Sequence, residues 1–143
     1  MQIRKAAKKD TKPMLELLAQ LRPRPTTKTR NFFIKTIQKY ISDKDKQILV
    51  AINDSKIIGL ASLVFLPRLN QKLELWIPEL VVDKNYRKKG VGKALIQYCI
   101  KIAKKKGCFR LRLESGNKRK GSHKFYKKIG FDQYALSFKK SIS

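Results

Sequence analysis

The most informative stretch of the sequence runs from Glu79 to Leu95 and reads ELVVDKNYRKKGVGKAL. It joins an apolar strand segment to a basic loop, a pair of glycines and the start of a helix. Gly90 and Gly92 let the backbone approach a ligand closely, because neither residue has a Cβ. The first amides of a helix have no partner inside it, and the helix dipole adds partial positive charge there. The stretch therefore predicts a binding site for a pyrophosphate.

Two other phosphate-binding loops fit this stretch less well. The P-loop pattern GxxxxGK[ST] fails because Arg87 stands at its first glycine and Ala94 stands at its Ser/Thr position. The dinucleotide pattern GxGxxG has Leu95 at its third glycine, although Glu114 lies where a ribose-binding acid is expected. A doubly wound domain also needs more parallel strands than the sequence supplies. We therefore favour neither alternative.

Two amphipathic helices are predicted near the N-terminus. Residues 2–6 favour a short first strand, and Asp10 is expected to be the N-cap of the helix that follows. Apolar residues at helical spacing define that helix: Met14, Leu15, Leu17, Leu18 and Leu21. The basic stretch Arg22–Pro25 ends it, and we expect this loop to line a binding site. The second helix has its apolar side formed by Phe33, Ile34, Ile37 and Ile41.

Three strands are predicted between these helices and the pyrophosphate site, over residues 47–52, 56–66 and 73–82. Asn53–Ser55 supplies the turn between the first two. The apolar run in the second strand is far shorter than a bilayer span and is typical of a buried strand. Pro78 interrupts the third strand, because proline removes a donor from the ladder. The sequence therefore predicts a β-bulge or a splayed pairing at Pro78.

A long helix follows the glycine pair and ends at Gly107. Its expected buried face is formed by Val91, Ala94, Leu95, Tyr98, Cys99 and Ile102. Residues 109–114 alternate between apolar and polar and predict a half-buried strand. A short helix over residues 121–128 and a closing strand over residues 131–138 complete the chain. We expect residues 1–143 to form one domain.

The charge of the chain is unusually positive, with 35 lysines and arginines against 10 acids and a net charge of +25. Between Lys84 and Lys128 there are 17 basic residues and one acid, Glu114. Such a field attracts polyanions, so non-specific binding to them is expected. Charge alone leaves nucleic acid, a phosphorylated cofactor and an anionic substrate as alternatives.

The two cysteines, Cys99 and Cys108, match no zinc-binding spacing, and we expect no metal site. Their number favours two reduced thiols in a cytoplasmic protein. The N-terminal residues lack the apolar stretch of a signal peptide, and no segment is long enough to span a membrane. We therefore expect no membrane partner.

Two motifs in the chain resemble those of the GNAT N-acetyltransferase superfamily. Residues 87–92, RKKGVG, match its motif A, Arg/Gln-x-x-Gly-x-Gly/Ala. Asn117 follows the next predicted strand, and FYKKIGF occupies residues 125–131, which matches the second motif, FYxxxGF. Gly121-Ser122 departs from a commoner alanine-containing pair. The resemblance covers nearly the whole chain and implies a GNAT-like α/β (α+β) fold: a mixed, mostly antiparallel sheet of 6–7 strands, splayed in the middle and flanked by about four helices.

The resemblance also implies acetyl-coenzyme A as cosubstrate and a set of residues that bind it. The backbone of Leu80, Val81 and Val82 would pair with the pantetheine arm. Asn117 would hydrogen-bond the pantetheine or cysteamine end, and Tyr126 would lie near the thioester sulfur. The pyrophosphate would be held by Arg87, Lys88, Lys89, Gly90, Val91, Gly92 and Lys93.

An amine is mostly protonated at neutral pH, so acetyl transfer by direct attack on a thioester needs a general base. Glu79 is the first candidate, beside the predicted splay, and Glu74 is a weaker second. Tyr126 is the candidate acid for the leaving thiolate, and backbone amides at the bulge would stabilise the developing oxyanion. No covalent enzyme intermediate is needed, so neither cysteine takes part.

The acceptor is expected to be a primary amine of a small molecule, and the charge of the chain favours an anionic or zwitterionic one. An enzyme that acetylates protein N-termini or lysines is the alternative enzyme. A basic nucleic-acid-binding module is the non-enzymatic alternative, although it would interleave base-stacking aromatics with the lysines. The protein is expected to be a monomer or a homodimer.

Overall fold

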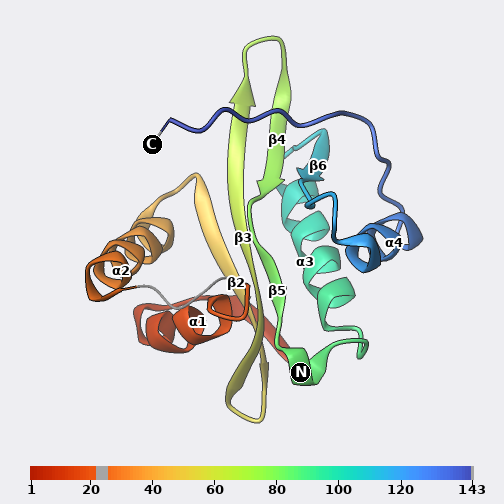
Figure 1. Cartoon of the computed structure of the whole chain (residues 1–143). Coiled ribbons are helices and arrows are strands. Elements are labelled where there is room, and N and C mark those ends of the chain that lie inside the picture. Colours follow the sequence, from red (N-terminus) through yellow and green to blue (C-terminus); the bar gives the residue numbers. More distant parts are fainter. Residues whose placement is uncertain (22–25, 143) are drawn as a thin grey trace. The chain divides into compact units, whose positions relative to one another are not determined.

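A computed structural model describes residues 1–21 and 26–142 of the chain (Figure 1). They form two compact units, Met1–Arg112 and Leu113–Ser143. The predicted loop Arg22–Pro25 lies outside the described residues. Among the residues that are described, no helix is long and apolar enough to cross a membrane.

The larger unit is built on a six-stranded, mostly antiparallel sheet, which confirms the predicted fold class. The strands follow the order β1-β2-β3-β4-β6, and β5 pairs with β3 beside this path. The pairs β1–β2, β2–β3, β3–β4 and β3–β5 are all antiparallel. The strand bounds are β1 Gln2–Lys5, β2 Lys46–Asn53, β3 Lys56–Arg68, β4 Gln71–Ile77, β5 Leu80–Val82 and β6 Arg110–Leu113.

The hairpin turn between β2 and β3 lies where the sequence predicted it, at Asn53–Ser55. Asn53 pairs with Lys56, so the loop has only two residues, Asp54 and Ser55. Their φ angles are 48° and 64°, the positive values that a type I′ turn requires at both central positions. Such a turn matches the right-handed twist of the two strands.

Helices cover both faces of the sheet in the larger unit (Figure 1). The helices α1, Thr11–Leu18, and α2, Thr27–Ser42, lie on one face, and α3, Val91–Lys105, lies on the other. The stripe predicted on the first helix is buried in one apolar cluster with the sheet: Met14, Leu15, Leu17, Ile37, Ile48, Val50, Ile57, Leu60 and Val81. Because β3 is covered on both faces, its apolar run is almost continuously buried, as predicted.

The helix α3 presents a different face to the sheet from the one predicted. Its buried residues are Val91, Leu95, Ile96, Cys99 and Ala103. Tyr98 was expected among them, but 37% of its surface is exposed. Because each residue turns a helix by about 100°, Tyr98 lies at one edge of the apolar face of α3. The sequence does not show which edge of this face the sheet buries; that depends on how α3 packs against the sheet.

Gly59 in β3 allows α3 to lie close to the sheet. A Cβ at this position would stand 3.0 Å from Cγ1 of Val91, 3.1 Å from Cδ1 of Leu95 and 3.2 Å from the carbonyl oxygen of Val81. The start of α3 is therefore seated against β3 and β5 at a depth that only glycine permits.

We expect Gly59→Ala to destabilise the protein by about 1–3 kcal/mol, because the added methyl overpacks this contact. Thermal unfolding should show a melting temperature lower by several degrees. Gly121→Ala is the matched control, since a Cβ there meets nothing within 4 Å. Equal melting temperatures for the two variants would contradict the close contact.

The smaller unit holds α4, Lys120–Lys128, and a C-terminal segment whose described residues are in no helix or strand. Gly130, with φ of 98°, follows the helix and ends it as predicted. The predicted closing strand over residues 131–138 was wrong, because none of these residues is in a strand. A strand exists only where its backbone bonds to a neighbouring strand, and apolar residues alone do not supply that neighbour. Leu136 and Phe138 are instead 77% and 89% exposed.

Candidate active site

The sheet divides at Pro78, where the sequence predicted a bulge or a splay. The strand β4 ends at Ile77 and β5 begins at Leu80, so Pro78 and Glu79 lie in the break. The strand β4 lies between β3 and β6, whereas β5 pairs with β3 and with no other described strand. The prediction of one strand over residues 73–82 was therefore wrong at its centre, since proline cannot donate to the ladder.

The outer edge of β5 carries backbone groups that point away from β3. The N–H of Ser62 donates to the Glu79 carbonyl at 2.9 Å, and the N–H of Asp83 donates to the Ile58 carbonyl at 2.8 Å. In an antiparallel pair, hydrogen-bonded positions alternate with positions whose groups face outward.

Leu80 and Val82 are the outward-facing positions of β5 by this alternation. The Val82 carbonyl accepts a 3.3 Å hydrogen bond from Nε of Arg87, which ties the strand to the basic loop. The rest of this edge is suited to an extended ligand that carries its own amide groups.

Glu79 is half-buried and held by Ser62 of β3. The Ser62 hydroxyl donates to the Glu79 carboxylate and accepts from the Glu79 N–H at 2.9 Å. Burial raises the pKa of the Tyr40 phenol on α2, and the negative charge of Glu79 raises it further. The carboxylate is thus oriented on the sheet face that α1 and α2 cover.

Neither Ser62 nor Tyr40 was predicted from the sequence. The available signal was a lone hydroxyl within the apolar run of β3, since a buried polar side chain requires a partner. That partner is 17 residues away in the chain.

The segment after β5 is a tight turn fixed by side-chain hydrogen bonds. Lys84–Tyr86 forms a short 3₁₀ helix, and the carboxylate of Asp83 accepts from the Asn85 N–H at 2.9 Å. This bond, helped by Lys56, holds the pKa of Asp83 below its ordinary value despite burial. The Lys84 N–H donates to Oε1 of Gln20 at 2.9 Å, so the turn is also anchored to the chain beyond α1.

The start of α3 offers an open row of backbone amides. Gly90 has φ of +83°, in the left-handed region that favours glycine. The Ala94 N–H donates to the Gly90 carbonyl at 3.0 Å, and no side chain caps the helix at Gly90. The amides of Val91, Gly92 and Lys93 precede this first helical bond, so they have no partner within the helix.

The side chains around this helix start are cationic and exposed: Arg87, Lys88, Lys89 and Lys93. The Lys89 ammonium lies 5.5 Å from the centroid of the Tyr86 ring. Free amides, the positive end of the helix dipole and exposed cations together suit a diphosphate.

Glu74, the second candidate for the base, is engaged elsewhere. Its side chain is fully buried and accepts from Arg112, from Nε of Arg110 at 2.5 Å and from Arg68 at 3.4 Å. Burial raises the pKa of Glu74, but the hydrogen bonds from Arg112 and Arg110 outweigh it, so the pKa lies below its ordinary value. A carboxylate held in this way is a weak base, which favours Glu79.

The smaller unit carries Asn117 and Tyr126. Asn117 lies in a turn in which the Gly116 carbonyl accepts from the Arg119 N–H at 3.0 Å and from Nε2 of His123 at 2.8 Å. Tyr126 lies on α4 in edge contact with the ring of Phe131, at 5.5 Å between centroids, and with that of Phe125. Burial raises the pKa of the Tyr126 phenol, against the opposing charge of Arg119, so the phenol stays protonated at neutral pH.

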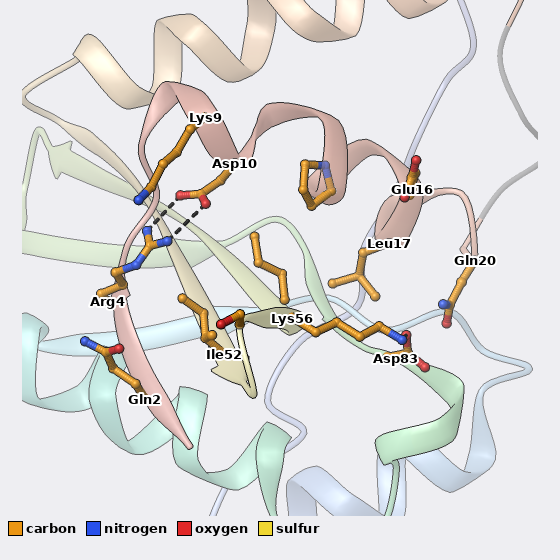
Figure 2. Close-up of a pocket in the computed structure, with 13 residues that line it drawn as sticks. Gln2, Arg4, Lys9, Asp10, Glu16, Leu17, Gln20, Ile52, Lys56 and Asp83 are labelled. Atoms are coloured by element: carbon orange, nitrogen blue, oxygen red, sulfur yellow. Dashed lines mark hydrogen bonds and ion pairs between the residues drawn. The ribbon is translucent and has the colours of Figure 1, made fainter.

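A separate cavity of about 820 Å³ lies in the larger unit beside α1 (Figure 2). Many of its charged side chains pair with one another, as Arg4 does with Asp10 at 2.7 Å and Lys56 with Asp83 at 3.7 Å. None of the residues predicted for catalysis or cofactor binding lines it. The cavity is lined by Gln2, Arg4, Lys9, Asp10, Pro13, Glu16, Leu17, Gln20, Ile52, Ser55, Lys56, Ile57 and Asp83.

Asp10 lies at the predicted N-cap position, but it does not cap the helix as predicted. It directly precedes α1, but its carboxylate makes no capping bond to that helix. It accepts instead from the Arg4 guanidinium and from the Ala7 N–H at 2.7 Å. The guanidinium is the stronger partner, and its hydrogen bond lowers the pKa of Asp10.

Comparison with known families agrees with this geometry. The model of the Acetyltransferase (GNAT) family matches residues 12–131, which is most of the chain. The chain belongs to the GNAT acetyltransferase family.

Individual relatives extend the comparison. The chain is 40% identical over 78 residues to a glucosamine 6-phosphate N-acetyltransferase of Trypanosoma brucei brucei, covering 53% of this chain and 51% of that protein. It spans about half the length of the curated relatives it matches. The crystal structure of a Trypanosoma brucei acetyltransferase is 26% identical, with a TM-score of 0.82 over 99% of each chain. A transcriptional regulator from Bacillus halodurans has a TM-score of 0.91 over 99% of each chain at 24% identity, which shows the shared fold.

Proposed function

We propose that the protein uses acetyl-coenzyme A to acetylate a primary amine of a small molecule. The observation that carries the proposal is the continuity of one short segment, in which the outward-facing edge of β5 leads through a fixed turn into the open amides of α3. The likeness to a glucosamine 6-phosphate N-acetyltransferase supports a small amine as acceptor.

The residues of this segment fit the two ends of the cosubstrate. We assign the backbone of Leu80, Val81 and Val82 to the pantetheine arm, with Leu80 and Val82 supplying the outward groups and Val81 bonded to β3. Asn117 is assigned to the cysteamine end. The diphosphate is assigned to Arg87, Lys88, Lys89, Gly90, Val91, Gly92 and Lys93.

Three catalytic roles are assigned to the protein: a general base, stabilisation of the oxyanion and a general acid. Bound acetyl-coenzyme A supplies the activated acetyl thioester. Glu79 accepts a proton from the acceptor amine, directly or through water, which frees the nitrogen lone pair for direct attack. The outward-facing N–H of Leu80, directly after the Pro78 break, stabilises the developing oxyanion. The Tyr126 phenol donates a hydrogen bond or a proton to the departing thiolate.

The two compact units are proposed to form one catalytic domain. The matched residues 12–131 cross the boundary between them at residue 112, and the assigned residues come from both. Both cysteines are free thiols, which favours a reducing compartment, so we retain the cytoplasm as the proposed location. The burial of Cys99 raises the pKa of its thiol to about 12, which agrees with its having no catalytic function.

The proposed function is tested by mixing the protein with acetyl-coenzyme A and a panel of amines and measuring release of the free thiol. The panel holds amino sugars, aminoglycosides, aminophosphonates, polyamines and peptides. Calorimetry with coenzyme A measures cosubstrate binding independently of the acceptor. A protein that bound no coenzyme A and released no thiol with any amine would overturn the proposal.

We expect Tyr126→Phe to lower kcat by about 100-fold, because it removes a general acid, while affinity for coenzyme A changes little. Steady-state kinetics and calorimetry measure the two quantities. Tyr98→Phe removes the same hydroxyl from an exposed position on α3 and should leave kcat unchanged. An unchanged kcat in Tyr126→Phe would remove the phenol from the mechanism.

A further inference from the structure

A buried carboxylate gathers three arginines from neighbouring strands in the larger unit. Glu74 of β4 is 0% exposed, and it accepts hydrogen bonds from Arg68 of β3 and from Arg110 and Arg112 of β6. The three arginine side chains remain 39%, 33% and 24% exposed, respectively. The buried Glu74 carboxylate thus holds the three guanidinium groups in place, while each of them stays accessible to solvent.

This arginine cluster, Arg68, Arg110 and Arg112, places three positive charges around the single buried carboxylate of Glu74. Glu74 supplies one negative charge against three, and subtracting Glu114, two residues after Arg112, still leaves an excess. Each guanidinium has five N–H donors, so three guanidinium groups together have more donors than one carboxylate can accept. Such a fork of donors binds phosphate and carboxylate groups preferentially.

Trp76 adds a polar group that lacks a partner at the same place. It lies two residues beyond Glu74 in β4, on the same face of the sheet. The Arg112 guanidinium lies 5.5 Å from the centroid of its ring. Its indole Nε1 is buried and has no hydrogen-bond acceptor, which is unusual for a native donor. An oxygen of a bound ligand would satisfy it.

The register of β3 relates this cluster to Glu79. Leu66 pairs with Glu74 and Val64 pairs with Trp76, while Ser62 bonds to Glu79. Alternate residues of β3 share one face, so the arginine cluster, Trp76 and Glu79 occupy successive rows of the same face. The two ends are separated by about 13 Å of strand, a gap that arginine side chains and a small molecule together can span.

We propose that the acceptor is a small amine that carries a phosphate or carboxylate group, and that the arginine cluster and the Trp76 N–H bind this group while Glu79 faces the amine. This inference rests on the proposed acetyltransfer at Glu79 and narrows its substrate class.

The first test compares amines that differ only in the anionic group. Glucosamine 6-phosphate is paired with glucosamine, and 2-aminoethylphosphonate with ethanolamine. We expect kcat/KM to be at least about tenfold higher for the anionic member of whichever pair reacts, since a charge-assisted hydrogen bond contributes that much. Equal or higher kcat/KM for the neutral member would overturn the inference while leaving the proposed acetyltransfer intact.

Arg68→Gln is the variant of choice, because Arg68 is the most exposed member and its contact with Glu74 is the longest. It should lower kcat/KM for the anionic amine by about tenfold and leave the neutral amine and the affinity for coenzyme A unchanged. Lys101→Gln, which removes an exposed charge from α3, is the matched control and should behave as wild type. Equal losses of kcat/KM in both variants would show that only the overall positive charge of the protein attracts the anionic amine, and would overturn the inference.

A second test requires no turnover. Trp76 is the single tryptophan of the chain, so its fluorescence reports on the cluster. Inorganic phosphate is titrated at constant ionic strength into protein saturated with coenzyme A, which occupies the proposed diphosphate site. We expect a saturable change in fluorescence that is weakened several-fold in Arg68→Gln and kept in Lys101→Gln. The absence of a saturable change, or an identical curve for Arg68→Gln, would overturn the inference whether or not coenzyme A binds.

Discussion

Replacing Glu79 by Gln is expected to lower kcat by about 100- to 10,000-fold at neutral pH, the range that a general base contributes. The substitution keeps the shape of the side chain and its contact with Ser62 but removes the proton acceptor. The reaction must then use the small fraction of acceptor that is already deprotonated. For an amine with a pKa of about 10, the deprotonated fraction rises roughly tenfold per pH unit below the pKa, so the variant's rate should rise by about 100-fold between pH 7 and pH 9.

Steady-state kinetics across this pH range measure both effects. Glu16→Gln, a substitution of the same kind at an exposed position on α1, should leave the wild-type pH profile unchanged. A Glu79→Gln enzyme with wild-type kcat would show that another group removes the proton. Since Glu74 is ion-paired and its pKa is lowered, it would not be the replacement.

Gly92→Asp is expected to weaken coenzyme A binding by at least about 100-fold. Gly92 is the second residue of α3, where its amide precedes the first helical hydrogen bond. An aspartate there would place a negative charge beside the diphosphate and compete for the same amides. The helix itself should remain stable, because a carboxylate in the first turn interacts favourably with the helix dipole.

Calorimetry with coenzyme A, combined with thermal unfolding, separates these two effects. Gly92→Ala adds a Cβ without charge and serves as the matched control, so the difference between the variants isolates the repulsion. We expect the alanine variant to bind more tightly than the aspartate variant. Normal affinity in Gly92→Asp would mean that the diphosphate binds elsewhere in the protein.

Local chemistry explains what could be predicted about the candidate site. Proline at 78 interrupts a strand wherever it lies, and the left-handed backbone at Gly90 favours glycine in any fold. The division of the sheet, the hairpin turn at Asp54 and Ser55 and the glycine-initiated α3 were therefore evident before any tertiary contact was known. The place of Glu79 beside the predicted splay also made it the candidate base, although the sequence did not indicate what orients it.

Contacts between distant residues could not be predicted in this way. The bond between Ser62 and Glu79 joins residues 17 apart, and Glu74 meets Arg110 and Arg112 across 36 and 38 residues. Both depend on the strand register, because a shift of one residue would turn these side chains to the opposite face. The error over residues 131–138 has the same origin, because the residues of a segment do not by themselves identify the strand with which it would pair.

The sequence by itself determined the elements whose causes are local: amphipathic periodicity, turn residues, the proline break and the amide-rich helix start. Only the tertiary structure decided which polar groups meet on the face of the sheet, including the orientation of Glu79 and the arginine cluster around Glu74. The physical reason is that periodicity acts within a few residues, whereas hydrogen bonds and ion pairs depend on strand register set by burial of the whole core.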